Sequence, residues 1–154
     1  MATKTNIVTV DDLGDSFNVE TTIRTYPDQA DPTQLTSGAG ANIVGNLVSV
    51  IAANTLTSNF HIIGVYACLP DTANEYAIYL SAEVAGSAPT GEKVIVPVNA
   101  ETTVPADTHD YISLAKPVYW DCTEPVCAAC SGPAAGKKIS VYIVIQTGLA
   151  PTKI

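Results

Sequence analysis

Apolar and polar residues alternate along several segments of this chain, with the period of two that a β-strand shows when one face of its sheet is buried. The alternation is clearest in Phe17–Tyr26, Glu75–Ala85 and Lys138–Thr147. The last segment has the most regular pattern, and we expect its apolar side chains to face the core. Those side chains are Ile139, Val141, Ile143 and Ile145.

Further segments are rich in β-branched residues, which suit the pleated surface of a sheet. Strong helix formers are scarce, although Ile43–Ala53 fits either a strand or a short helix. Pro97 and Pro117 lie within two of these segments and remove donors from a strand ladder, so we expect edge strands or bulges there. The segments are Thr3–Val10, Ile43–Ala53, Phe60–Leu69, Glu92–Val98 and Tyr111–Trp120.

About eight strands separated by turn residues predict an all-β fold. The uneven connections favour an antiparallel β-sandwich of the jelly-roll kind. We expect one such domain over residues 1–154, with a long loop at 27–42, a polar connection at 99–110, a cysteine-bearing loop at 121–136 and a C-terminal arm at 148–154. A loop as long as the first is either functional or an arm.

Composition and charge exclude several classes of protein. Only 14% of the residues are charged and 47% are hydrophobic, which excludes a disordered chain and a coiled coil. The net charge of -8 opposes binding to phosphate backbones and to anionic membrane surfaces, so we expect no nucleic-acid and no membrane partner. The N-terminal residues lack an apolar stretch behind a basic start, which predicts synthesis in the cytoplasm without a signal peptide.

The cysteines are the most specific chemical feature of the sequence. Cys122, Cys127 and Cys130 lie in one predicted loop, and Cys68 ends a strand far upstream. The two thiolates of a CxxC turn can bind one zinc ion, and Cys122 and Cys68 could complete a four-thiolate site. A disulfide from Cys122 to Cys127 or Cys130 is a second interpretation, and free buried thiols are a third.

The glycines of the long loop give a weaker signal. Gly40-x4-Gly45 begins like a phosphate-binding loop, but Asn46 and Leu47 stand where such a loop has Lys and then Ser or Thr. The cation that would bind phosphate is therefore missing. We interpret these residues as ordinary loop glycines.

The histidines and acidic residues form no convincing catalytic set. His61 lies on an apolar strand, which favours a structural role, and His109 lies in a polar turn without a nucleophile motif. Asp11, Asp12 and Asp15 lack the spacing of an EF-hand calcium loop. We therefore predict no catalytic residues and no cofactor, and we expect that the protein is not an enzyme.

Tyrosine dominates the aromatic residues, with 7 Tyr against 2 Phe and 1 Trp. These side chains form either a sugar-stacking or interface patch, or ordinary cross-strand packing. Coplanar, exposed rings on one face would favour carbohydrate binding. The aromatic residues in predicted strands include Tyr66, Tyr76, Tyr79, Tyr111, Tyr119, Trp120 and Tyr142.

In its Thr-, Ala-, Val- and Gly-rich β composition, its few charges and its start without a leader, the chain resembles small structural proteins of tailed-phage virions. These are head decoration (cement) proteins and the bases of head fibres or spikes. The resemblance covers the chain by composition and includes no motif, so it assigns no functional residue. It implies a β fold, many copies per particle and a location in the virion, with binding to a major capsid protein.

The same resemblance implies a homo-oligomer, with a trimer favoured because it places such proteins at threefold positions. Closed symmetry would also cover the edges of the predicted sheets. A carbohydrate-binding β-sandwich that uses surface aromatic residues is the alternative function. A small metal-dependent hydrolase is a third, and it lacks the cluster of His or carboxylate residues that it needs.

Overall fold

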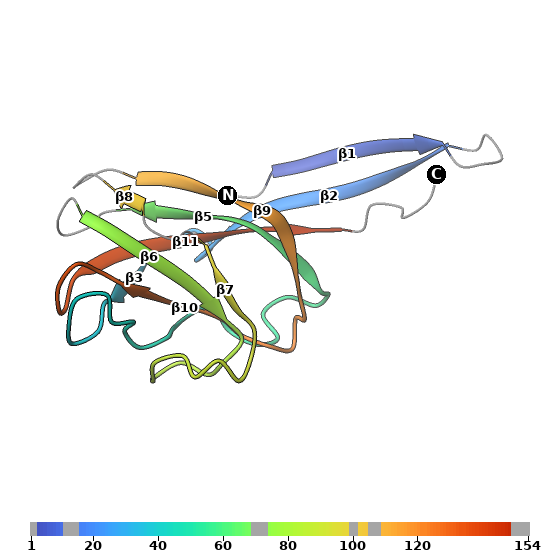
Figure 1. Cartoon of the computed structure of the whole chain (residues 1–154). Coiled ribbons are helices and arrows are strands. Elements are labelled where there is room, and N and C mark those ends of the chain that lie inside the picture. Colours follow the sequence, from blue (N-terminus) through green and yellow to red (C-terminus); the bar gives the residue numbers. More distant parts are fainter. Residues whose placement is uncertain (1–2, 11–15, 69–73, 99–101, 105–108, 149–154) are drawn as a thin grey trace.

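β-Strands provide the regular structure of the computed structural model, which describes residues 3–10, 16–68, 74–98, 102–104 and 109–148. Side chains are described for residues 22–68, 76–98 and 111–148. Within these ranges the chain forms eleven strands, which make two antiparallel sheets packed face to face (Figure 1). No helix in the described ranges is long and apolar enough to cross a membrane.

The first sheet has the strand order β1–β2–β11–β5–β9, and β3 also pairs with β11. Its strands are β1 (Thr3–Val10), β2 (Ser16–Tyr26), β3 (Thr33–Thr36), β5 (Phe60–Cys68), β9 (His109–Trp120) and β11 (Lys138–Thr147). The second sheet has the order β4–β10–β6–β7, and β8 also pairs with β6. Its strands are β4 (Val48–Ile51), β6 (Asn74–Ser81), β7 (Ile95–Pro97), β8 (Thr102–Val104) and β10 (Val126–Ser131).

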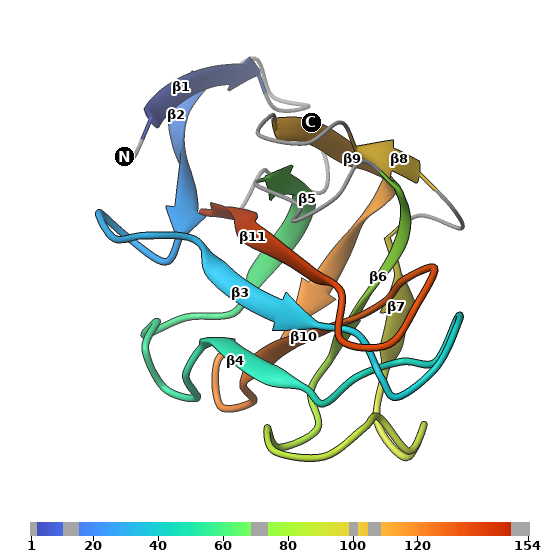
Figure 2. The same cartoon turned by 90° about the vertical axis from the view of Figure 1, so that its left-hand side faces the viewer.

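The strand pairs are nested as in a jelly roll. β2 and β3 pair with β11, β4 with β10, β5 with β9 and β6 with β7, so the first half of the chain pairs with the second half in reverse order. The chain crosses between the sheets from β3 to β4, and Figure 2 shows these two strands side by side. The predicted antiparallel jelly-roll sandwich is therefore confirmed, with more strands than the eight expected.

The core lies between the two sheets and contains side chains from both. All four apolar side chains predicted to face the core from β11 are 0% exposed. From the second sheet, Tyr76, Ile78 and Leu80 of β6 belong to the same cluster. Alternate residues of each strand point to the same face, so these strands have the period of two that the sequence shows.

Three of the predicted connections contain strands. The loop expected at 27–42 includes β3, which pairs with Lys138–Val141, so this segment extends the sheet and is not a free arm. The loop expected at 121–136 includes β10, which is buried on both faces. The connection expected at 99–110 includes β8 and the first residues of β9.

The strand β10 was not predicted from the sequence, because both of its faces are covered. A strand buried on both sides has no polar face, so it shows no alternation of apolar and polar residues. The segment expected at Ile43–Ala53 is a strand, as favoured, but only Val48–Ile51 of it forms β4. The C-terminal arm expected at 148–154 lies outside the described residues beyond Gly148.

Both prolines predicted at sheet edges lie on edge strands. Pro97 is part of β7, the last strand of the second sheet, and Pro117 is part of β9, the last strand of the first sheet. Residues 114–117 of β9 lie opposite Ile63 alone, so the ladder between β5 and β9 is interrupted there. This bulge places the proline where no ladder donor is required.

The β1–β2 hairpin continues the first sheet past its other strands. β2 pairs with β11 through Thr22–Tyr26 and with β1 through Ser16–Ile23. Within the described residues, positions 16–21 of β2 therefore have β1 as their only neighbour in the sheet. Figure 1 shows this hairpin extending away from the sandwich.

Replacing Ile143 with Ala tests the assignment of the core. We expect the substitution to lower the free energy of unfolding by about 2–5 kcal/mol, because it leaves a cavity between the sheets. The matched control is Val84→Ala at a side chain that is 76% exposed, where we expect a change within about 0.5 kcal/mol. Urea denaturation measures both, and equal effects of the two substitutions would contradict the assignment.

Candidate functional site

The cysteines predicted as a metal or disulfide cluster lie on different faces of the two sheets. Cys127 and Cys130 both belong to β10, and positions three apart in a strand point to opposite faces. Cys130 accordingly lies in the core between the sheets, and Cys127 packs with Leu47 and Ala129 on the outer face of the second sheet. This CxxC pair is therefore part of a strand and cannot bind one ion as a turn would.

The other two cysteines lie elsewhere. The Sγ of Cys68, on β5, donates to the carbonyl of Ser140 on β11 at 3.4 Å. Cys122 follows β9 and packs against the core from a half-buried position. The cysteines are free thiols, and no three metal-binding side chains come together among the described residues. Three of the four thiols are buried, and that of Cys122 is half-buried.

The loop glycines are close-packed and do not form a phosphate site. A Cβ on Gly45 would lie 1.8 Å from the carbonyl oxygen of Thr36, so only glycine fits at this position. The backbone N–H of Gly45 donates to Cys130, and that of Gly38 donates to Ile43. These donors therefore hold the loop together.

Of the other candidate residues, His61 has both its backbone and its side chain within the described ranges. Its ring contacts Tyr119 edge to face, with ring centres 5.6 Å apart and an interplanar angle of 73°. Asp11, Asp12 and Asp15 lie outside the described residues, as does the side chain of His109.

The aromatic residues divide into a buried group and an outer row. Tyr76 and Trp120 are in the core. Tyr142, Tyr66 and Tyr111 lie directly opposite one another on β11, β5 and β9, so they form a row on the outer face of the first sheet. We call these three residues the tyrosine row.

The tyrosine row is packed on itself. The rings of Tyr66 and Tyr111 are 4.8 Å apart and tilted by 47°. A Cβ on Gly64 would lie 2.3 Å from the hydroxyl oxygen of Tyr111, so this glycine lets the tyrosine ring lie on β5. The hydroxyl of Tyr142 donates to the carbonyl of Ala30 at 2.8 Å. The rings are tilted and are not the coplanar platform that would favour sugar stacking.

A pocket of about 340 Å³ lies where the β6–β7 loop meets the turn after β9. We call it the Trp120 pocket. Its apolar lining combines two buried residues, Ala82 and Trp120, with two exposed ones, Val94 at 59% and Tyr119 at 60% exposure. Its polar lining consists of Lys93, Asp121 and Glu124.

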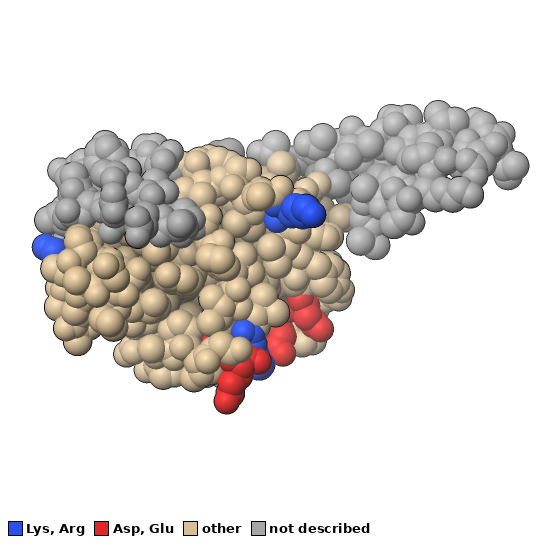
Figure 3. Space-filling model, viewed as in Figure 1, with Lys and Arg blue, Asp and Glu red and all other residues tan. Residues whose placement is uncertain are grey.

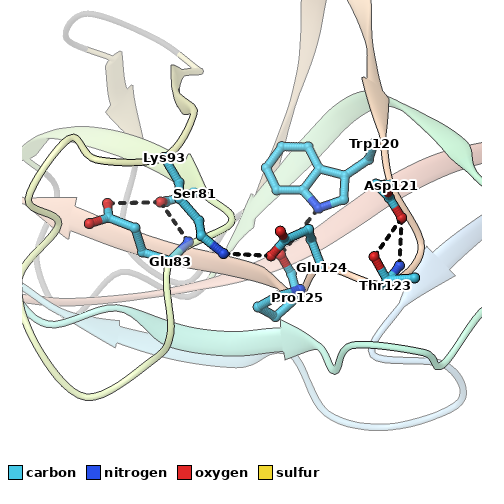
Figure 4. A network of polar contacts seen from close by, with 8 residues as sticks. All are labelled: Ser81, Glu83, Lys93, Trp120, Asp121, Thr123, Glu124 and Pro125. Carbon is cyan, nitrogen blue, oxygen red and sulfur yellow. Dashed lines mark hydrogen bonds and ion pairs between the residues drawn. The ribbon is translucent and has the colours of Figure 1, made fainter.

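Hydrogen bonds fix the polar side of this pocket (Figure 4). The indole Nε1 of Trp120 donates to the carbonyl of Pro125 at 3.1 Å, which fixes the orientation of the ring. Lys93 Nζ and Glu124 Oε2 form an ion pair at 2.8 Å between the loop and the turn. Asp121 Oδ1 accepts bonds from the backbone N–H and the hydroxyl of Thr123, and the backbone bond lowers the pKa of Asp121 most.

Glu83 holds the loop that forms one wall of the pocket. Its Oε1 accepts bonds from both the hydroxyl and the backbone N–H of Thr90, and its Oε2 accepts one from the hydroxyl of Ser81. The bonds from Thr90 lower the pKa of Glu83 below its ordinary value. The loop therefore closes around a carboxylate that stays ionised at neutral pH.

The surface around these features carries little charge. Figure 3 shows one face on which most side chains are uncharged, with the acidic side chains and a basic one gathered along its lower edge. Sequence reasoning singled out Tyr119 and Trp120 as aromatic candidates but not Lys93, Glu124 or Glu83. Glu83 and Lys93 lie in the β6–β7 loop and Glu124 lies in the turn after β9, and the three form no sequence motif.

Chemical labelling tests the arrangement of the cysteines. We expect iodoacetamide to modify half-buried Cys122 in the native protein, while buried Cys68, Cys127 and Cys130 react only after unfolding. Burial raises the pKa of the Cys68 and Cys127 thiols, which further slows their reaction at neutral pH. Mass spectrometry counts the labels, and a melting temperature that falls on adding a chelator would show that the protein binds a metal.

Substituting Glu83 with Gln tests how the loop is held. We expect faster hydrogen exchange at the amides of Thr90 and Gly91, because the amide side chain replaces one acceptor oxygen with a donor. The control, Glu92→Gln at an exposed neighbour, should leave exchange at these amides unchanged.

A pH titration tests the same contact. The pKa of Glu83 is lower in the folded chain, so its stabilisation is present above the unfolded pKa of about 4.3. It is lost as pH falls through the lower folded value. The amide shifts of Thr90 and Gly91 should therefore move only below about pH 4.3, and a midpoint above that value would exclude a lowered pKa.

No known protein family matches the sequence, and no curated protein does. A chain from a solved structure titled "Structure of infectious bursal disease virus Gx strain" aligns with 99% of this chain, at 10% identity and a TM-score of 0.37. This protein spans 43% of the length of that chain. With so low a likeness, the function has to be inferred from the fold and the surface described above.

Proposed function

We propose that this protein is a structural component of a virion, and specifically a decoration or cement protein that binds and stabilises a phage head. It acts by assembly and is not an enzyme. Its partners are further copies of itself, favoured as a trimer, and a major capsid protein. Three features support this proposal, namely the jelly-roll sandwich, the small number of charged residues and a long sheet edge at β1 that has no proline or bulge.

The edge strand β1 is the observation that carries the proposal. Exposed edge strands readily pair with other chains, and soluble proteins protect them with proline, bulges or short strands. Within the described ranges, β9 carries Pro117 and a bulge, β7 carries Pro97, and β3 and β4 each have only four residues.

Within the described residues, the edge strand β1 has only one protective feature, the charge of Lys4. It runs for eight residues, contains no proline and pairs with β2 in an unbroken register. Its sequence, TKTNIVTV, is rich in β-branched residues and has one charge, on Lys4. A strand with these properties suits pairing with a strand of another subunit, which is a common mode of assembly.

The surface and fold agree with such a role. Jelly rolls are frequent in viral capsid domains as well as in lectins. A net charge of -8 spread over 22 charged residues, 7 basic and 15 acidic, leaves most of the surface neutral. Uncharged polar groups cost less to remove from water than charged groups do when many copies pack side by side.

A proline scan of β1 tests the proposal. Proline replaces Thr5, Asn6, Ile7 and Val8 one at a time, because the N–H groups of alternate residues point to the two sides of a strand. Two of the variants remove donors from the open edge, and two remove donors from the β1–β2 ladder. We expect the open-edge variants to keep the melting temperature and to lose at least about tenfold in affinity for the particle.

Affinity is measured by co-sedimentation with capsid-sized particles purified from the cells that make the protein. Substituting Ile43, an exposed residue between β3 and β4, with Ser provides a control that should bind normally. A chain that stays monomeric and never co-purifies with a particle would contradict the proposal. Normal binding by every proline variant would exclude β1 as the assembly edge.

A further inference from the structure

We propose that the Trp120 pocket binds a neutral saccharide, as one or two pyranose rings. This inference is independent of the proposed assembly role, since it rests on different residues. The pocket measures about 340 Å³, close to the lower limit of roughly 300 Å³ for small-molecule sites. It is therefore large enough for a compact ring and too small for an extended segment of protein.

The charges around the pocket exclude most other ligands. The ion pair of Lys93 with Glu124 leaves Asp121 as the excess charge, so the lining is net negative and opposes phosphates and carboxylates. Most of the pocket lining is apolar, and its polar groups lie beside that apolar part. A neutral ligand with an apolar face and hydroxyl groups fits both parts of the lining without bringing a like charge to Asp121.

The polar groups have bonding capacity left for hydroxyls. The bonds that Thr123 makes to Asp121 both end on Oδ1, so they do not use Oδ2. The ammonium of Lys93 has three protons, of which the contact with Glu124 uses one. A sugar hydroxyl both donates and accepts, so it can bridge a carboxylate and an ammonium group.

The aromatic side of the pocket is held rigid before any ligand binds. Tyr119 is 60% exposed, its hydroxyl accepts a bond from Asn59 Nδ2, and its ring rests edge to face against His61. The ring of Trp120 is 4% exposed and is fixed by Pro125, so it supports the pocket from the core while Tyr119 supplies the exposed aromatic face. An amphipathic sugar ring can place its C–H face on such a surface, and little conformational entropy is lost on binding.

The loop that forms the opposite wall is also fixed. Glu83 accepts bonds from Ser81 and Thr90, which hold the loop that carries Lys93 and Val94. The pocket is therefore formed in the free protein. A formed pocket with exposed apolar side chains on two sides suits a ligand that has an apolar face and a polar rim.

Trp120 provides the measurement, because it is the only tryptophan in the chain. The full-length protein is titrated with methyl glycosides of glucose, galactose and mannose, with N-acetylglucosamine, and with maltose, cellobiose and lactose. We expect at least one of them to change the tryptophan fluorescence with a Kd of about 1 mM or below. Saturation-transfer NMR on the same sugars should show contact through the C–H protons of one ring face.

Variants locate the binding. Tyr119→Ala should weaken binding at least about tenfold, and Tyr119→Phe, which retains the ring, should change it less than about threefold. Lys93→Met and Glu124→Gln change exposed side chains, so they should keep the fold and each weaken binding several-fold. The control is Tyr66→Ala, which removes a comparably exposed tyrosine from the tyrosine row and should leave binding unchanged.

Three results would overturn the proposal. The first is the absence of any fluorescence or NMR response to every sugar at about 50 mM. The second is an equal loss of binding in the Tyr66 and Tyr119 variants. The third is binding of p-cresol without binding of any sugar, which would assign the pocket to an apolar side chain of a protein partner. None of these results contradicts particle binding, so the saccharide proposal can fail while the proposed function stands.

Discussion

The pairing of β11 with three other strands is the constraint on which the structure depends. One edge of β11 pairs with β3 and then β2, and the other pairs with β5. Without β11, the first sheet would separate into the β1–β2 hairpin, the short strand β3 and the β5–β9 pair. β11 follows all the other described strands in the sequence, so the sheet can close only when residues 138–147 are present. Contacts between such distant segments make folding slow but also make the closed sandwich cooperative.

The sequence predicted strands whose residues alternate between apolar and polar types or are rich in β-branched side chains. The segments Thr3–Val10 and Lys138–Thr147 were predicted with the bounds that β1 and β11 have, and the edge prolines were assigned correctly. The strands that it missed depend on tertiary contacts. β10 has no polar face, and β3 is a strand because β11 lies beside it, although its surroundings are rich in loop-forming residues.

The candidate sites were predicted less well, because sequence spacing does not give the direction of a side chain. The C-x-x-C pattern suggests a turn with converging thiols, yet the same spacing on β10 sends Cys127 and Cys130 to opposite faces. In the Trp120 pocket, by contrast, residues that are distant in the sequence come together in the fold. Lys93 and Glu124 are 31 residues apart and meet only because the jelly roll brings the β6–β7 loop to the turn after β9. Only its aromatic half, Tyr119 and Trp120, could be found in the sequence.

An open strand edge and a rigid pocket contribute different properties to recognition. Pairing along β1 would use backbone groups, which every partner strand offers, so it supplies affinity with little discrimination. Discrimination has to come from side chains with unused bonding capacity. In the tyrosine row, the hydroxyl of Tyr142 already donates to Ala30. The rings of Tyr66 and Tyr111 pack on each other, which leaves less of their faces open to a ligand. The Trp120 pocket retains donors and acceptors beside a fixed aromatic surface. It is therefore the part of the described surface best suited to distinguish one ligand from another.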